Sequence, residues 1–304
     1  MESPHIPVLK EEIVAAFGKI EEGIIVDCTL GYGGHTEALL AANPKIRVIG
    51  IDQDIEAVTF ATKRLAPFKE RIKILHGCFS QMVTTLEGAP IRGILADIGV
   101  SSLQLDKKER GFGFAGESLD MRMDRERELT AQEVVNRYSR ADLERIFREY
   151  GEVREYKKAA ALITERRPFG TASELAGFLA EHLKGGKIHP ATLIFQAIRI
   201  EVNDELGELK RLLKSIENLK LTKTLVGIIS FHSLEDRIVK QTFKEWSRSC
   251  ICPPEAPRCL CSNDHALGRI VTKKPITPTE EEIAKNPRSR SAKLRLFQIE
   301  RPHP

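Results

Sequence analysis

The sequence predicts an α/β protein in which helices cover a mostly parallel sheet and an all-helical domain is inserted between two of the strands. Short apolar runs alternate with helical patterns through the first hundred residues, as in parallel sheets covered on both faces. Only helical patterns follow from residue 105 to about residue 219, and an apolar run then resumes at residues 224–230. We therefore expect a sheet domain of residues 1–104 and 220–304, and an inserted helical domain of residues 105–219.

The first predicted strand leads into a glycine turn. Residues 23–26 form a short apolar run that ends at Asp27, and Gly31, Gly33 and Gly34 follow. Glycines allow the backbone to turn sharply and to approach a ligand closely. A helix beginning near Gly34 would direct its free N–H groups toward a negatively charged group.

The second predicted strand, residues 48–52, ends in the carboxylate of Asp52. Asp52 follows the glycines by about 20 residues, the separation at which nucleotide-binding units place an acceptor for ribose hydroxyls. The pattern Gly-x-Gly-Gly lacks the third glycine that dinucleotide sites use beneath a pyrophosphate. S-adenosylmethionine, which has a ribose and an amino-acid end but no phosphate, suits this turn. The alternative is that the glycines form only a tight turn and Asp52 caps the next helix.

Further strands are expected at residues 72–76, 93–97 and 224–230, and alternation of apolar and charged residues at 292–296 predicts a last, half-buried strand. Asp97 ends the fourth strand, so Asp27, Asp52 and Asp97 should face one crevice at the carboxyl edge of the sheet. His232 follows the fifth strand. It is a general base, a ribose contact or a structural hydrogen-bonding residue, and we favour the last two. Ser233 and Asp236 have the spacing of a helix capping box.

Two features of the predicted helical domain suggest a substrate surface. Beyond His189-Pro190, a polar stripe recurs at helical spacing. It consists of Thr192, Gln196, Arg199 and Asn203. In the loop after the fourth strand, Phe112 and Phe114 are candidates for stacking on an unpaired base of single-stranded RNA. Burial of these rings in a core between the domains is the competing interpretation.

The overall charge does not by itself indicate a nucleic-acid partner, because the formal net charge is only +4. Residues 285–299 hold a local basic strip, which includes Arg288 and Arg290 and contains no acidic residue. This strip is a candidate phosphate contact, or else a charged strand edge exposed to solvent. No apolar run is long enough to span a membrane, and residues 1–5 show no signal-peptide pattern, so we expect a soluble cytoplasmic protein.

Four of the six cysteines form two closely spaced pairs. Cys250 and Cys252 make one C-x-C pair, and Cys259 and Cys261 make the other. Four thiolates of this kind can hold a tetrahedral structural zinc ion. The alternative is that they are reduced, unliganded cysteines in a loop.

Several motifs together resemble the bacterial small-subunit ribosomal RNA methyltransferase H (MraW) family. The resemblance covers nearly the whole chain, and its motifs are highly specific in combination. They are the turn at residues 29–35, Ile-Gly-Val-Ser-Ser at 98–102, Arg-Gly-Phe-Gly-Phe at 110–114, Leu-Asp-Met-Arg-Met-Asp at 119–124, His-Pro-Ala-Thr at 189–192, Ser-Phe-His-Ser-Leu-Glu-Asp-Arg at 230–237 and Asn-Pro-Arg-Ser-Arg-Ser at 286–291. Two departures are Cys28, where glycine is usual, and Gly113, where serine is common.

The resemblance implies a class I (Rossmann-like) methyltransferase that transfers a methyl group from S-adenosylmethionine to the exocyclic N4 amine of a specific cytidine in 16S, small-subunit ribosomal RNA. It implies that the cofactor contacts include His35, Phe79, Asp97 and Gln104, in addition to the glycines and Asp52. We expect Asp97 to be the catalytic residue. The candidate RNA contacts are Phe112, Phe114, Arg199, Asn203, His232, Arg288 and Arg290.

The expected partner is small-subunit ribosomal RNA, within an assembled or nearly assembled subunit, and no membrane partner is expected. The sequence leaves open which cytidine is chosen and whether the protein dimerises. Two other functions are weighed against this one. A nicotinamide-dependent oxidoreductase is disfavoured by the missing third glycine. A non-catalytic RNA-binding assembly factor is disfavoured because Asp52 and Asp97 are both present with the glycine turn.

Overall fold

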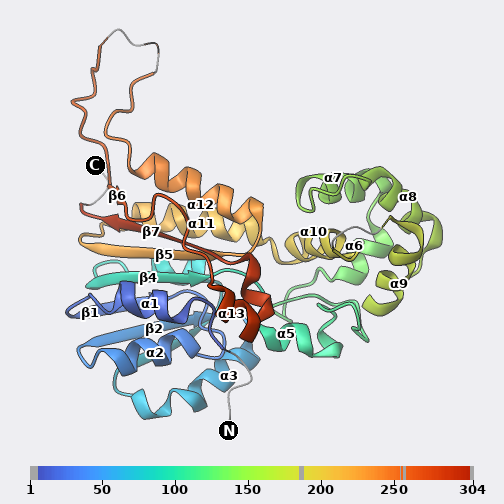
Figure 1. The fold of residues 1–304 in the computed structure, drawn as a ribbon, viewed down its shortest axis with the longest axis horizontal. Coiled ribbons are helices and arrows are strands. Elements are labelled where there is room, and N and C mark those ends of the chain that lie inside the picture. The colour runs from blue at the N-terminus through green and yellow to red at the C-terminus, as the bar shows by residue number, and fades with distance from the viewer. Residues whose placement is uncertain (1–5, 185–187, 254, 256–257, 302–304) are drawn as a thin grey trace. The chain divides into compact units, whose positions relative to one another are not determined.

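The structure is a computed structural model that describes residues 6–184, 188–253, 255 and 258–301. The chain forms two compact units. The sheet unit consists of residues 1–99 and 207–304, and the helical unit of residues 100–206 (Figure 1).

The sheet unit contains a seven-stranded sheet in the order β3-β2-β1-β4-β5-β7-β6. Strands β1 to β5 pair in parallel, whereas β7 pairs antiparallel with both β5 and β6. The strands are β1 (Gly23–Asp27), β2 (Ile46–Asp52), β3 (Ile72–His76), β4 (Ile91–Asp97), β5 (Thr224–Ser230), β6 (Gly268–Ile270) and β7 (Lys293–Ile299). The predicted parallel sheet is confirmed, and β6 is a strand that the sequence patterns did not indicate.

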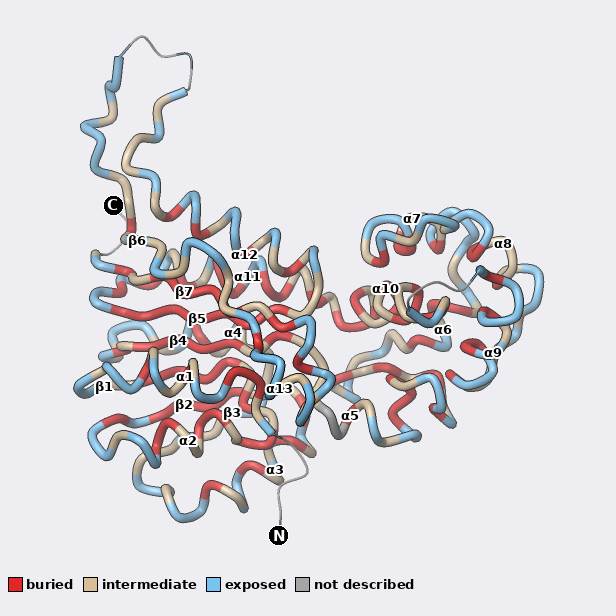
Figure 2. Tube along the Cα trace, viewed as in Figure 1, coloured by how far each residue is buried: buried red, intermediate tan, exposed pale blue. Residues whose placement is uncertain are grey.

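Helices cover both faces of this sheet, as the nearly continuous apolar strands require. On one face, Ile25 of β1 packs in a cluster with α1 and α2, while on the other, Val26 packs with α4, α11 and α12. Buried residues accordingly follow the central strands in Figure 2. The helices of this unit are α1 (Lys10–Phe17), α2 (Gly34–Ala42), α3 (Ile55–Arg64), α4 (Phe79–Thr84), α11 (Glu205–Asn218), α12 (Ser233–Trp246) and α13 (Glu280–Lys285), with 3-10 turns at Ala66–Phe68 and Pro287–Ser291.

The helical unit has its own hydrophobic core, in which residues such as Phe147, Ile163 and Ile198 are fully buried. Its α6 helix begins with a capping box, because the side chains of Thr130 and Glu133 each accept a hydrogen bond from the other residue's backbone N–H. The helices are α5 (Ser102–Asp106), α6 (Ala131–Arg137), α7 (Arg140–Glu149), α8 (Tyr156–Arg166), α9 (Ala172–His182) and α10 (Thr192–Asn203), with a 3-10 turn at Lys108–Arg110.

The compact helical unit ends earlier than the expected insertion of residues 105–219. Helix α11 lies almost entirely in the sheet unit, because Leu209, Leu212 and Ile216 are buried in the cluster against the sheet. The unit also begins earlier, at residue 100 rather than 105. The sequence pattern identified the helix but not the face against which its apolar stripe packs.

Two local expectations are wrong. Strand β7 does not alternate between buried and exposed residues, because Arg295 is only 8% exposed and forms a bidentate pair with Asp236 of α12, at 2.7 and 3.2 Å. The helix cap before α12 is displaced by one residue from the expected Ser233 box. His232 is the N-cap, and Glu235 completes the box.

Candidate functional site

The order of the strands creates a switch point between β1 and β4. The chain proceeds from β1 to β2 on one side, and β4 lies on the other side of β1. In doubly wound sheets, ligands bind beyond the carboxyl ends of the strands at such a point. Asp27 ends β1, Asp52 ends the neighbouring β2 and Asp97 ends β4, so the three carboxylates lie at one edge, as expected.

The glycine turn is packed tightly against the protein itself. Gly33 has a φ of 78°, and a Cβ there would lie 3.0 Å from Leu65 Cδ1. A Cβ on Gly34 would lie 2.5 Å from Pro7 Cγ. A Cβ on Gly31 would lie 3.9 Å from Thr29 O, an ordinary van der Waals distance, and the φ of Gly31 is 50°. Backbone conformation and packing therefore favour glycine at positions 33 and 34, and Gly31 is the least crowded of the three.

Asp52 fixes the glycine turn and does not cap the following helix. Its Oδ2 accepts a hydrogen bond from Gly31 N at 2.7 Å, and its Oδ1 accepts one from Asp54 N at 2.8 Å. Asp54 is the residue that caps α3, accepting from Glu56 N at 3.0 Å. Asp52 is partly exposed, and burial raises the pKa of its carboxyl group to about 6. The capping alternative is thus wrong, and the carboxylate has further lone pairs for donors such as ribose hydroxyls.

Asp97 and His35 form a second polar pair. Thr29 Oγ1 accepts a hydrogen bond from Asp97 N at 2.6 Å, which ties β4 to the turn after β1. His35 Nε2 lies 3.4 Å from Asp97 Oδ2. Asp97 Oδ1 and both His35 ring nitrogens are buried without a hydrogen-bond partner among the described residues. Because buried polar atoms are nearly always paired, these atoms indicate a polar ligand at this edge.

Asp27 is the buried support of this site. Its Oδ2 accepts from Thr36 Oγ1 at 2.7 Å and its Oδ1 from Thr29 N at 3.2 Å, while burial raises the pKa of its carboxyl group. Thr29 and Thr36 were not among the expected site residues. Their signal in the sequence is that both are polar residues flanking the glycines at the end of an apolar strand.

The site fits S-adenosylmethionine. Asp52 offers acceptors for a ribose diol, and the unpaired ring nitrogens of His35 offer partners for the charged amino-acid end, while a contact of Asp97 with the cofactor stays a prediction. Phe79 begins α4, is half-buried and packs against the sheet core. Its contact with a cofactor stays a prediction. So does that of Gln104, which belongs to the helical unit, where its Oε1 accepts from Ser101 N at 3.0 Å.

Two of the candidate RNA contacts are core residues of the helical unit. Phe112 is 6% exposed and packs in the hydrophobic cluster. Asn203 is 1% exposed, and its side chain accepts from Met123 N at 2.8 Å and donates to the carbonyl groups of Met121 and Arg199 at 2.8 and 2.9 Å. Neither side chain is available to RNA in this arrangement, because their surfaces or polar groups are already used inside the unit.

Two other residues of this unit differ in how accessible they are. Phe114 is 38% exposed, stacks on His189 with ring centroids 4.5 Å apart and meets Phe195 edge to face at 5.1 Å. Arg199 forms a bidentate pair with the buried Glu205, at 2.7 and 3.0 Å. The polar stripe of α10 therefore serves mainly internal contacts, whereas the Phe114 ring presents an aromatic surface.

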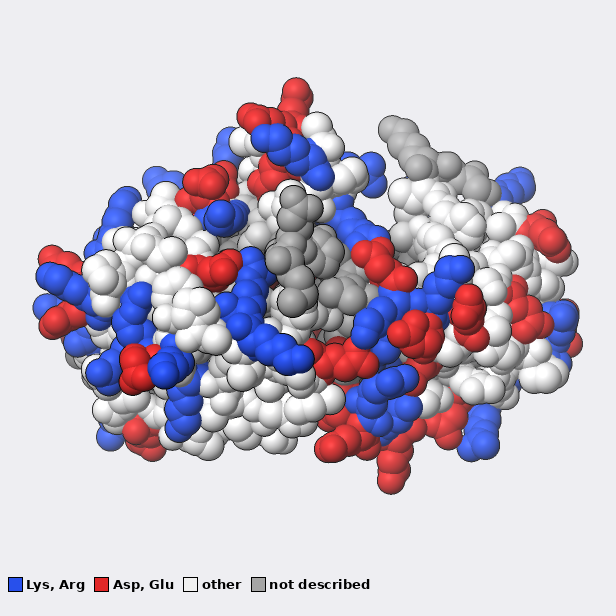
Figure 3. Space-filling view, turned by 90° about the horizontal axis from the view of Figure 1, so that it is seen from below, with Lys and Arg blue, Asp and Glu red and all other residues white. Residues whose placement is uncertain are grey.

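In the sheet unit, His232 has a structural role. Its Nδ1 accepts from Glu235 N at 3.4 Å, and its side chain is buried against the fully buried Glu235. The predicted basic strip is divided, since Arg295 pairs with Asp236 while Arg288 and Arg290 are exposed. Positive and negative side chains are intermixed over the face in Figure 3, as the small net charge suggests. In the part of the chain that the structure describes, no helix is both long and apolar enough to cross a membrane.

Comparison with known proteins identifies the family. The family model described as the MraW methylase family matches residues 2–300. Proteins named "Ribosomal RNA small subunit methyltransferase H" from Aliarcobacter butzleri and Wolinella succinogenes are each 58% identical to this chain, over 99% and 98% of its length and 100% and 99% of theirs. A protein of the same name from Sulfurimonas denitrificans is 56% identical, over 98% of this chain and 99% of its own.

These matches span the sheet unit and the helical unit together, and they agree with the motif resemblance and with the cofactor geometry at the ends of β1, β2 and β4. This chain belongs to the MraW methylase family.

Proposed function

We propose that this protein transfers a methyl group from S-adenosylmethionine to the exocyclic N4 amine of a cytidine in small-subunit ribosomal RNA. Membership of a methylase family supports the reaction type. The names of full-length relatives, which are at least 56% identical, support the RNA class. The choice of N4 rests on the resemblance of the motifs.

The observation that carries the proposal is the carboxylate of Asp97 at the end of β4, with Oδ1 buried and unpaired. The lone pair of a cytosine amine is delocalised into the ring, so the amine is a weak nucleophile. An acceptor for its N–H groups favours the geometry in which the lone pair localises on nitrogen. Asp97 is held for this task by its backbone bond to Thr29 and by the neighbouring His35.

The bond changes balance without a further reactant. S-adenosylmethionine supplies an electrophilic methyl group on a positively charged sulfur. The amine lone pair forms the new N–C bond, and the pair of the breaking S–C bond stays on sulfur. The nitrogen then loses one proton, which Asp97 accepts or which passes to water. In the sheet unit, Asp52 and the Gly31 turn orient the ribose, so that the methyl group is held in one position.

We further propose that the helical unit binds the RNA, with Phe114 and His189 as its stacking surface. The N4 amine is accessible only in an unpaired or flipped base. Exposed aromatic rings hold such bases by stacking. Arg288 and Arg290 of the sheet unit are exposed cations suited to phosphate. The proposal places the reaction in the cytoplasm, on an assembled or nearly assembled subunit.

The test is to incubate the protein with isotope-labelled S-adenosylmethionine and small ribosomal subunits from cells that lack this activity. Digestion of the RNA then identifies the labelled nucleoside. We expect labelled N4-methylcytidine at one position. Label in another nucleoside would refute the atom assignment, and absence of label with intact cofactor binding would refute the RNA substrate.

A further inference from the structure

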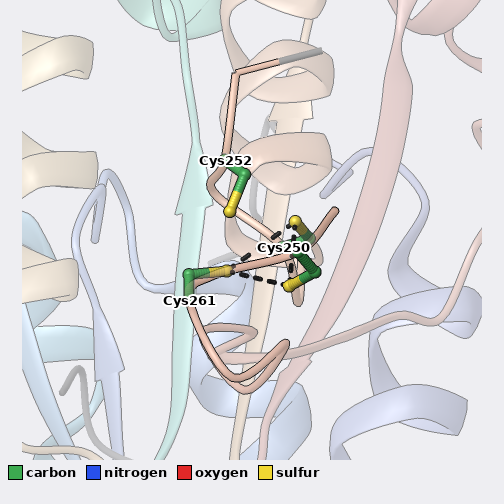
Figure 4. A group of neighbouring side chains, drawn as sticks. Cys250, Cys252 and Cys261 are labelled. Atoms are coloured by element: carbon green, nitrogen blue, oxygen red, sulfur yellow. Dashed lines mark hydrogen bonds between the residues drawn. The ribbon is translucent and has the colours of Figure 1, made fainter. Parts of the chain in front are cut away.

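A cluster of four thiols lies in the sheet unit, in the loop between α12 and β6 (Figure 4). The Sγ atoms of Cys250, Cys252, Cys259 and Cys261 all lie within 4.8 Å of one another. The two Cys-x-Cys pairs are separated in sequence, so folding of the loop brings them together. This loop stands out from the sheet in Figure 1.

Three of the sulfur atoms have the spacing of one face of a tetrahedron around a metal ion, and the fourth, of Cys252, lies within 4.8 Å of each of them. Sulfur atoms at about 2.3 Å from a zinc ion in tetrahedral geometry are about 3.8 Å from each other. The Cys250–Cys259, Cys259–Cys261 and Cys250–Cys261 distances are 3.7, 3.6 and 3.7 Å. Three nearly equal edges are the pattern expected when sulfur atoms surround a common centre.

The same distances disfavour the other ways in which four cysteines can be used. A disulfide joins two sulfur atoms at about 2.05 Å and would single out one partner for each cysteine. Here Cys259 is equally close to Cys250 and to Cys261. An iron–sulfur cluster places several iron and sulfide atoms between its cysteines, so it needs a wider cage than these edges allow.

Backbone contacts give the cluster a second feature of structural metal sites. Ile251 N donates to Cys261 Sγ at 3.4 Å, and Leu260 N donates to Cys252 Sγ at 3.2 Å. Each donor lies between the two cysteines of one pair and bonds a sulfur of the other pair. Such N–H groups stabilise the negative charge that thiolates carry when they bind a metal.

In the described part of the loop, polar contacts outside the thiol cluster lie near its base, such as Ser249 Oγ to Asn263 Oδ1 at 2.9 Å. Ile251 and Leu260 are 61% and 74% exposed, so the apolar residues inside the two pairs do not form a core. The base of the loop is closed by the backbone bond from His265 N to Ser249 O at 2.9 Å. His265 is not a fifth ligand, because its Nε2 lies 2.9 Å from the carbonyl oxygen of Cys261.

We propose that Cys250, Cys252, Cys259 and Cys261 bind one zinc ion in a closed, tetrahedral, structural site that holds the loop between α12 and β6. Four thiolates favour zinc among the common divalent ions, and they leave no open position for a substrate or water. The metal contributes folding free energy to a segment whose apolar residues between the paired cysteines, Ile251 and Leu260, are exposed. The proposal does not depend on the methyl-transfer reaction.

The experiment measures the metal content of the full-length protein, purified under reducing conditions, by inductively coupled plasma mass spectrometry. We expect about one zinc per chain in the wild type. The double substitution Cys250→Ser/Cys261→Ser should lower the zinc content at least about fivefold, since two ligands are lost. Cys78→Ser is the matched control, because it removes a thiol outside the cluster and should leave the zinc content unchanged.

Replacement with cobalt keeps the test decisive if the double variant does not fold. Wild-type protein stripped of metal and given Co²⁺ should show the intense ligand-field and thiolate charge-transfer bands of a tetrahedral four-sulfur site. Removal of the metal should also speed trypsin cleavage after Arg258, which lies exposed between the two pairs. The proposal would be overturned by protein that is purified without zinc, whose cluster thiols react rapidly with a thiol reagent, and that gives no such cobalt bands. Iron and sulfide in place of zinc would also overturn it.

Discussion

Removal of the Asp52 charge should uncouple cofactor binding from pH. Burial raises the pKa of Asp52 to about 6, and the carboxylate is the form that can accept two ribose hydroxyls. At pH 7.5 nearly every molecule carries the carboxylate, whereas at pH 5 only about one in ten does. We therefore expect the wild type to bind S-adenosylmethionine about tenfold more weakly at pH 5 than at pH 7.5.

Asp52→Asn should weaken binding at pH 7.5 by about 10- to 100-fold, the range for losing a hydrogen bond to a charged group. Isothermal titration calorimetry at the two pH values measures both effects. The variant keeps every other titrating group, so the contrast isolates Asp52. An equal affinity of the wild type at both pH values would refute the reasoning, as would an Asp52→Asn variant that retains the same tenfold loss.

The same carboxyl group predicts how stability varies with pH in the cofactor-free protein. Its pKa is higher when folded, at about 6, than the ordinary value of 3.8, so between these values the folded chain binds more protons than the unfolded chain. The contribution of Asp52 to the free energy of unfolding should therefore fall as pH rises through this window, by about 3 kcal/mol in total. Urea unfolding at pH 4.5 and 7.5 measures the free energy of unfolding of the wild type and of Asp52→Asn. The stability of the variant relative to the wild type should be greater at pH 7.5 than at pH 4.5.

Four further substitutions test other parts of the structure. Asp97→Asn should lower kcat at least about 100-fold, because it removes the proposed acceptor, and normal turnover by the variant would remove Asp97 from the mechanism. Phe114→Ala should weaken binding of small-subunit RNA by about 1–3 kcal/mol with little change in stability. Phe112→Ala should instead lower the free energy of unfolding by about 3–5 kcal/mol, because this ring is buried. Filter binding measures the first effect and urea unfolding the second, and the reverse result would contradict the burial of the rings. Arg295→Met should lower the free energy of unfolding by about 3 kcal/mol at neutral pH, because Asp236 loses its bidentate partner and keeps Lys293 at 3.6 Å. Burial would raise the pKa of Asp236, but Arg295 holds it below the ordinary value. The loss of stability caused by Arg295→Met should therefore shrink as the pH falls below about 4. A loss that does not depend on pH would contradict the pairing.

The sequence determined those strands whose local apolar pattern matches the buried position that they occupy in the folded protein. Strands β3 and β5 lie where their apolar runs predicted, because strands buried on both faces need apolar residues throughout. Asp52 and Asp97 were identifiable as candidate site residues because each stands at the end of such a run. Their meeting at one edge follows from parallel pairing, which the strand–helix alternation predicts.

The tertiary structure alone decided which polar and aromatic residues are used internally. Asn203 and Phe114 look equally suited to RNA in sequence, yet the first is hydrogen-bonded inside the helical unit and the second is exposed. Arg295 reads as an exposed strand residue until its partner Asp236, 59 positions away, is brought beside it. Periodicity reports which face of an element a residue occupies, but burial of a polar group depends on a partner from elsewhere in the chain, and only the folded structure supplies that partner.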